Sequence, residues 1–214
     1  LIGMYIREGR HKEVKKLLEK IRAFGYKKSR INQSSYPESD ILRTYNIEME
    51  LYRDTENWTE AVDLYPVMRK KLEDATDALT SKFKASFYFQ FAYIHFMIKD
   101  YKTCIYWNNE LALLPGAIQR EDLLLQSKIL NLMLQYDLGS FSVLAYSLLS
   151  IKRSLAYRKI KGSNSLKAIL SMFSKLAKSS KGDHRRIFKS FLEKMNNGEE
   201  YNWLKLKQWM ESKI

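Results

Sequence analysis

Apolar residues recur along this chain at intervals of three and four positions, the spacing that places them on one face of an α-helix. The first stripe consists of Val14, Leu17, Leu18 and Ile21, and we expect its helix to end at Gly25. No alternating strand pattern longer than four residues occurs in the sequence. The pattern therefore predicts an all-α protein.

The same spacing predicts further helices after this stripe. Residues 27–40 are rich in lysine and serine and contain Pro37, so we expect a loop there. Pro66 lacks the amide hydrogen that a helix interior uses, and it should kink its helix or mark the first turn. The predicted helices cover approximately residues 41–53, 59–75, 83–98, 101–114, 121–137, 141–160, 165–178, 184–195 and 199–212.

A short corner separates the two members of each of four helix pairs. The residues that end successive corners stand 47, 43 and 40 positions apart. A two-helix period of about 34–45 residues is typical of α-solenoids, so the spacing predicts stacked antiparallel helical hairpins. The corners are Gly9-Arg10-His11, Glu56-Asn57-Trp58, Lys99-Asp100-Tyr101 and Gly139-Ser140-Phe141.

Residues 85–115 resemble a tetratricopeptide repeat. In their first helix the bulky Tyr88 precedes the large–small pair Phe91-Ala92. The corner Asp100-Tyr101 follows, and the small Cys104 stands three positions after it. Small residues let two helices approach closely while aromatic rings fill the remaining gaps.

The resemblance extends in part to residues 42–75 and faintly to the other hairpins. One departure is Glu48, which occupies a position that is apolar in the family. The resemblance implies an all-α, right-handed α-α superhelix of stacked antiparallel hairpins. On this interpretation residues 1–160 form the helical repeats, and the first repeat is truncated. Residues 161–214 form basic C-terminal helices that cap the repeats and belong to the same domain.

In tetratricopeptide arrays the first helix of each repeat lines a concave groove that binds peptides. Arginines in such a groove could hold a carboxylate through forked hydrogen bonds, and aromatic rings could supply apolar pockets. The alternative is that the arginines pair with Glu48, Glu50 or Asp54 and that the aromatic rings pack against the adjacent repeat. The resemblance places the groove on Arg43, Asn46, Glu50, Arg53, Phe89, Tyr93, Phe96 and Met97.

The formal net charge of +13 is concentrated in the last third of the chain. Residues 151–214 hold 16 Lys/Arg and 5 Asp/Glu, a formal charge of +11. Several cations on one face could bind nucleic acid or an anionic surface, and the alternative is a solvated basic face. The candidate basic patch consists of Lys152, Arg153, Arg158, Lys159, Lys161, Arg185, Arg186 and Lys189.

The sequence contains no recognisable catalytic motif. Its three histidines are isolated, and it has no zinc-protease, Gly-rich phosphate-binding or nucleophile-elbow pattern. A single cysteine, Cys104, excludes an internal disulfide and a cysteine-based metal site. We therefore expect no enzymatic activity, no metal and no cofactor.

These observations predict a non-enzymatic scaffold that binds a protein or a peptide. The chain starts at Leu1 inside an apolar pattern, so we expect it to be part of a longer protein that could self-associate through its truncated first repeat. No run approaches the roughly 18 apolar residues of a membrane span. A free thiol favours a reducing compartment, and we expect the protein in the cytoplasm.

Overall fold

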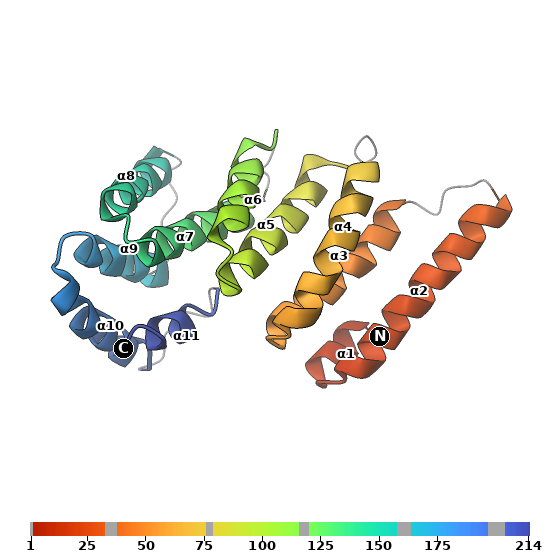
Figure 1. Ribbon diagram of the computed structural model, residues 1–214, viewed down its shortest axis with the longest axis horizontal. Coiled ribbons are helices and arrows are strands. Elements are labelled where there is room, and N and C mark those ends of the chain that lie inside the picture. Colours follow the sequence, from red (N-terminus) through yellow and green to blue (C-terminus); the bar gives the residue numbers. More distant parts are fainter. Residues whose placement is uncertain (1, 33–37, 76–78, 116–119, 158–163, 197–203) are drawn as a thin grey trace. The chain divides into compact units, whose positions relative to one another are not determined.

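The computed structural model describes residues 2–32, 38–75, 79–115, 120–157, 164–196 and 204–214 (Figure 1). Its regular elements are helices, as the apolar spacing predicts, and no strand occurs in these ranges. The helices are α1 (Ile2–Arg7), α2 (His11–Asn32), α3 (Glu38–Asp54), α4 (Trp58–Asp74), α5 (Ser81–Met97), α6 (Tyr101–Leu113), α7 (Glu121–Asp137), α8 (Phe141–Tyr157), α9 (Asn164–Leu176), α10 (Lys181–Asn196) and α11 (Leu206–Glu211).

Some expectations about the helices need correction. The helix of the first stripe does not end at Gly25 but runs on as α2 to Asn32, and α3 begins at Glu38. The loop expected at 27–40 is therefore wrong at 27–32 and at 38–40, and residues 33–37 lie outside the described part. A glycine costs a helix only about 1 kcal/mol relative to alanine, too little to end it. Of the two alternatives for Pro66, the first turn is excluded, because Pro66 lies inside α4, and the kink stays a prediction. The last helix, α11, is shorter than expected, although residues 199–203 are not described.

The four corners share one backbone conformation. Gly9, Glu56, Lys99 and Gly139 all have left-handed φ values, of 69°, 59°, 64° and 69°. At three of them the next amide donates to a carbonyl five positions back, as from Asn57 to Tyr52. These bonds satisfy carbonyls that the helix end would leave unpaired. The predicted corners are therefore C-terminal caps of the preceding helices. In each corner the next helix begins two residues after the residue with the positive φ.

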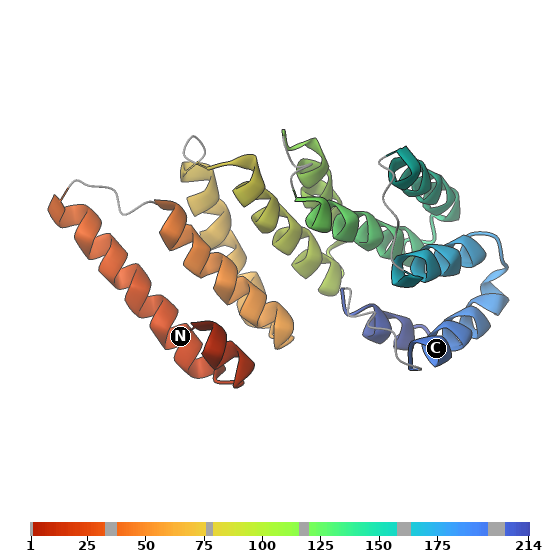
Figure 2. The same ribbon diagram turned by 180° about the vertical axis from the view of Figure 1, so that it is seen from behind.

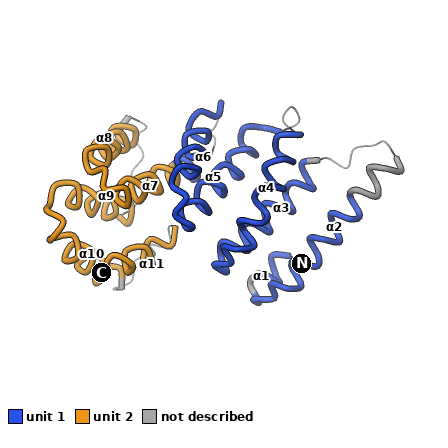
Figure 3. The backbone as a smooth tube through the Cα atoms, viewed as in Figure 1, with its two compact units in different colours: residues 1–124 blue, residues 125–214 orange. Residues whose placement is uncertain are grey.

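The chain divides into two compact units, residues 1–124 and 125–214 (Figure 3). The boundary between these units lies inside α7. The division into repeats at 1–160 and capping helices at 161–214 stays a prediction. Unit 1 contains α1–α6, and unit 2 contains α8–α11 with most of α7.

Unit 1 is built of consecutive packed helix pairs, as the views from both sides show (Figures 1 and 2). Each of α1–α5 packs on the helix that follows it, and α3 also packs on α5. The small residues Ala61, Ala92 and Cys104 are fully buried. Aromatic rings fill the spaces around them, with the Tyr65 ring centroid 4.9 Å from that of Phe91. The close approach predicted for α5 and α6 is therefore confirmed.

Unit 2 has its own aromatic core. The Tyr136 ring on α7 lies 5.3 Å from Phe188 on α10 and 5.4 Å from Trp209 on α11, measured between centroids. The indole Nε1 of Trp209 donates to both carboxylate oxygens of Asp137, each at 3.2 Å. Lys213 Nζ lies 2.6 Å from the same carboxylate. The two C-terminal helices are thus held to the end of α7.

Candidate binding surfaces

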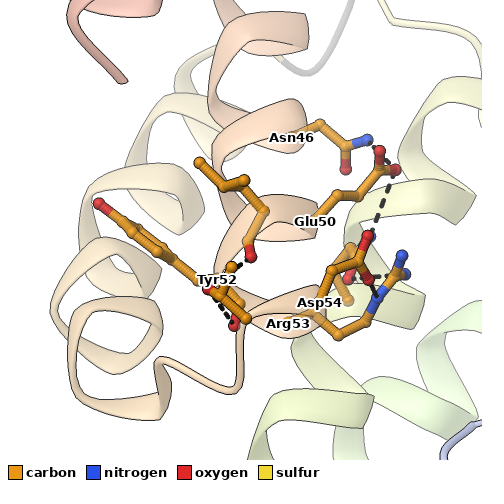
Figure 4. A network of polar contacts seen from close by, with 8 residues as sticks. Asn46, Glu50, Tyr52, Arg53 and Asp54 are labelled. Carbon is orange, nitrogen blue, oxygen red and sulfur yellow. Dashed lines mark hydrogen bonds and ion pairs between the residues drawn. The ribbon is translucent and has the colours of Figure 1, made fainter. Parts of the chain in front are cut away.

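A network of hydrogen-bonded polar side chains joins α3 to α5 in unit 1 (Figure 4). Glu50 Oε1 accepts from Asn46 Nδ2 at 2.9 Å and from Gln90 Nε2 at 3.4 Å. Arg53 donates to Gln90 Oε1 at 3.5 Å and to Asp54 Oδ1 at 3.0 Å. Three of these five residues belong to the predicted groove. Arg53 has the neighbouring acidic partner that the alternative interpretation expects.

Arg43 lies on the same face of α3 as Asn46, Glu50 and Arg53, because the four stand at helical spacing. Its side chain is 66% exposed and lies 4.0 Å from Asp40, at the limit of an ion pair. Exposed ion pairs of this kind contribute little stability, so the guanidinium remains available to another carboxylate. Arg43 is the most accessible cation of the predicted groove.

The aromatic residues of the predicted groove are buried. Phe89, Tyr93 and Phe96 are at most 4% exposed, and Met97 is half-buried. Tyr93 packs edge to face against Trp58 at 6.2 Å and stacks on Phe89 at 6.2 Å. Burial raises the pKa of the Tyr93 hydroxyl far above its ordinary value. These rings fill the interior and offer no surface to a ligand in this structure.

Glu48, the departure from the family pattern, is buried in a polar network between α2 and α3. Its carboxylate accepts from the Arg22 guanidinium and, at 2.7 Å, from the Tyr52 hydroxyl. Arg22 also donates to Thr44 Oγ1 at 2.7 Å and lies 3.9 Å from the Tyr45 ring centroid. An acid at this position is therefore satisfied by a cation that the preceding helix supplies.

The predicted basic patch belongs to unit 2, which holds 17 Lys/Arg and 6 Asp/Glu, a formal charge of +11. Lys152 and Arg153 are exposed near the end of α8, and Arg185, Arg186 and Lys189 are exposed on α10. The structure brings Lys152 and Arg186 to two grooves that flank α9. The other patch members, Arg158, Lys159 and Lys161, lie outside the described residues.

The larger groove, of about 690 Å³, lies between α9 and α10, and the smaller, of about 350 Å³, lies between α8 and α9. Ser171 and Ser174 line both. The sequence analysis missed the other cations of these grooves, which are Lys167, Lys175, Lys178 and Lys194. A signal was available, because Lys167, Ser171, Ser174 and Lys175 recur at helical spacing along α9, and Lys178 follows in the turn after it.

The histidines in the described core have packing roles. His95 Nδ1 lies 2.8 Å from the carbonyl oxygen of Phe91 one turn earlier. His184 Nδ1 lies 3.1 Å from the Tyr136 hydroxyl. Among the described residues no group of three or more His, Cys, Asp or Glu could hold a metal ion. A search of the same residues finds no helix long and apolar enough to cross a membrane.

Cys104 is expected to resist alkylation in the folded protein. It is fully buried, and burial raises the pKa of its thiol to about 12. At about pH 8 the reactive thiolate would then be only about one ten-thousandth of the population. Iodoacetamide labelling followed by mass spectrometry should show no modification of the native chain and rapid modification in urea. Equal rates in both states would contradict this burial.

Comparison of the chain with models of protein families, with curated proteins and with solved structures finds no match.

Proposed function

We propose that this protein is a non-enzymatic helical-repeat scaffold that binds a protein or peptide partner through the α3 face of unit 1. The observation that supports it is the polar row on this face. Arg43 is exposed there, and Asn46, Glu50 and Arg53 are half-buried beside it. A row of hydrogen-bonding side chains on packed hairpins can recognise an extended acidic segment without any change in the core.

The proposal includes the finer architecture that the sequence suggested, a tetratricopeptide-like right-handed superhelix. Two features of unit 1 support it. Each helix packs on the next, and α3 packs on α5, so the first helices of neighbouring hairpins lie together. The small residues expected at the hairpin crossings are buried. A stack of this kind exposes one row of helices to a ligand along its length.

The buried aromatic residues change the kind of ligand that fits. With Phe89, Tyr93 and Phe96 in the interior, the face offers polar groups in place of apolar pockets. These are the two arginines, the Asn46 amide and the Glu50 carboxylate, which already accepts from Asn46. Arg43 could bind an acidic side chain or a terminal carboxylate directly. Arg53 would first exchange its contact with Asp54, which is a surface pair and is easily replaced.

Removing both arginines, as Arg43→Ala with Arg53→Ala, is expected to weaken peptide binding by about tenfold or more, since each hydrogen bond to a charged group contributes about 1.5–3 kcal/mol. The probe is a random peptide library displayed on phage and selected on the purified chain. We expect it to yield acidic peptides, whose affinities are then measured by fluorescence anisotropy.

The matched control is Arg69→Ala, which removes an arginine that is also paired with a carboxylate, Glu73, but stands on α4. It should change affinity by no more than about twofold. A selection that yields no binding peptide, or peptides that bind the double variant and the wild type equally, would refute the proposal.

A further inference from the structure

We propose that unit 2 binds single-stranded nucleic acid through the two grooves that flank α9, and that the sugar–phosphate backbone crosses α9 at Ser171 and Ser174. This inference is independent of the peptide-binding proposal, because the residues that carry it belong to α8, α9, α10 and the turn between α9 and α10. Its ligand is a polyanion and its site lies within one compact unit.

The larger groove is positively charged, and among the described residues three of its four cations have no ion-pair partner, the exception being Arg186. Lys175, Lys178 and Lys194 line the larger groove, and none of them forms an ion pair with any residue that the structure describes. The acid in this groove, Asp183, is already engaged by Arg186 at 2.9 Å and by the Ser180 hydroxyl at 2.8 Å. An incoming phosphate would therefore meet unpaired ammonium groups and a neutralised carboxylate.

The groove walls also supply hydrogen-bond donors. Ser171, Ser174 and Ser190 line the larger groove together with Ser179. The hydroxyl oxygen of Ser179 is buried and has no hydrogen-bond partner among the residues that the structure describes. Serine hydroxyls and lysines are common donors to phosphate oxygens, and such contacts position a nucleic acid without reading its sequence.

The remaining lining is apolar. Met172, Ile187 and Phe191 contribute to the larger groove, and Leu155, Leu166 and Leu170 contribute to the smaller one. A single-strand site usually combines cations along the backbone with aromatic rings on which bases stack, and the described lining supplies one such ring, Phe191, which is 7% exposed. This lining favours a nucleic acid over a free phosphate, which would use the charges alone.

The dimensions favour a single strand over a duplex or a membrane. Axes of adjacent packed helices stand about 8–10 Å apart, so the groove between them is narrow. A duplex is stiff over about 150 base pairs and carries its phosphates on its outer surface. A lipid surface cannot enter a recess between helices. A single strand is flexible enough to follow both grooves over α9.

The test measures fluorescence anisotropy of labelled oligouridylate and oligothymidylate, each of about 20 nucleotides, with the full chain at about 50 mM salt. We expect the wild type to bind both, and to bind a duplex of the same length more weakly. Raising the salt should weaken binding steeply, by about 0.7 in the logarithmic slope for each phosphate contact.

The groove variant is Lys175→Gln with Lys178→Gln, and the control is Arg185→Gln with Lys189→Gln. The residues of both pairs are exposed, and each double variant removes two positive charges from unit 2. The first pair lines the larger groove, whereas the control pair lines neither groove. We expect at least a tenfold loss for the groove pair, with a salt slope shallower by about 1.4, and no more than about threefold for the control. Circular dichroism confirms that both remain folded.

Three outcomes would overturn the proposal. The first is the absence of an anisotropy change with the wild type. The second is equal weakening by the two variants, which would indicate diffuse attraction by net charge. The third is binding of phosphatidylserine vesicles but of neither oligonucleotide, which would assign the basic surface to a membrane.

Discussion

Replacing Glu48 by alanine is expected to destabilise unit 1 by about 3–5 kcal/mol, because the Arg22 guanidinium would remain buried without its carboxylate. The side chains of Arg22 and Glu48 are only 12% and 5% exposed. The Tyr52 hydroxyl would also lose its acceptor. Urea denaturation followed by circular dichroism should show a large shift of the unfolding midpoint. This loss approaches the whole stability of a small domain.

Two controls separate the buried pair from ion pairing in general. Glu73→Ala breaks the exposed pair with Arg69 on α4 and should cost about 0.5 kcal/mol or less. The triple replacement Arg22→Met, Glu48→Leu and Tyr52→Phe removes the network without leaving an unpaired group. It should unfold near the wild type or above it, since apolar replacements of buried pairs are often neutral or stabilising. If Glu48→Ala cost no more than Glu73→Ala, the network would not stabilise the fold.

Replacing Trp209 by alanine is expected to cost about 3–5 kcal/mol in unit 2, as is usual for large buried aromatic residues. Trp209 is 8% exposed and contacts Tyr136, Phe188 and Phe173. A six-residue helix is not stable by itself, so α11 depends on this anchor. Hydrogen exchange should show loss of amide protection in α11 and, to a smaller extent, in α10.

The conservative variant Trp209→Phe keeps the ring packing and loses the Nε1 hydrogen bonds to Asp137. Its expected cost is about 1.5–3 kcal/mol, the usual contribution of hydrogen bonds to a charged group, while Lys213 still pairs with the carboxylate. Glu211→Ala, an exposed change on the same helix, should have almost no effect. Equal stability of Trp209→Ala and Glu211→Ala would show that α11 is not needed for the unit.

The helices and their corners could be predicted from sequence because they depend on local information. Apolar spacing located α3 and α5 to within a few residues, and the corners placed the starts of α4 and α6. The extension of α2 through Gly25 was missed, since a glycine weakens a helix without ending it. Long-range partners decide such cases, and a single sequence does not show them.

The candidate sites depend even more on contacts between residues that are distant in the sequence. Glu48 was recognisable as a misplaced acid, but its partner Arg22 stands 26 positions earlier on another helix. Periodicity could not tell whether Tyr93 and Phe96 face a ligand or the interior, because both arrangements use the same spacing. The grooves beside α9 combine residues from three helices, so they become visible only when those helices are placed together.

The left-handed corners bear on how relatives of this chain could be found. The residue that adopts the positive φ is a glycine twice, a glutamate once and a lysine once. The feature that recurs is therefore a positive φ at similar intervals along the sequence, while the amino acid that adopts this φ varies. Evolution could replace most side chains around such hinges and keep the architecture. A search for proteins of this architecture should therefore score the intervals between helix ends as well as residue identity.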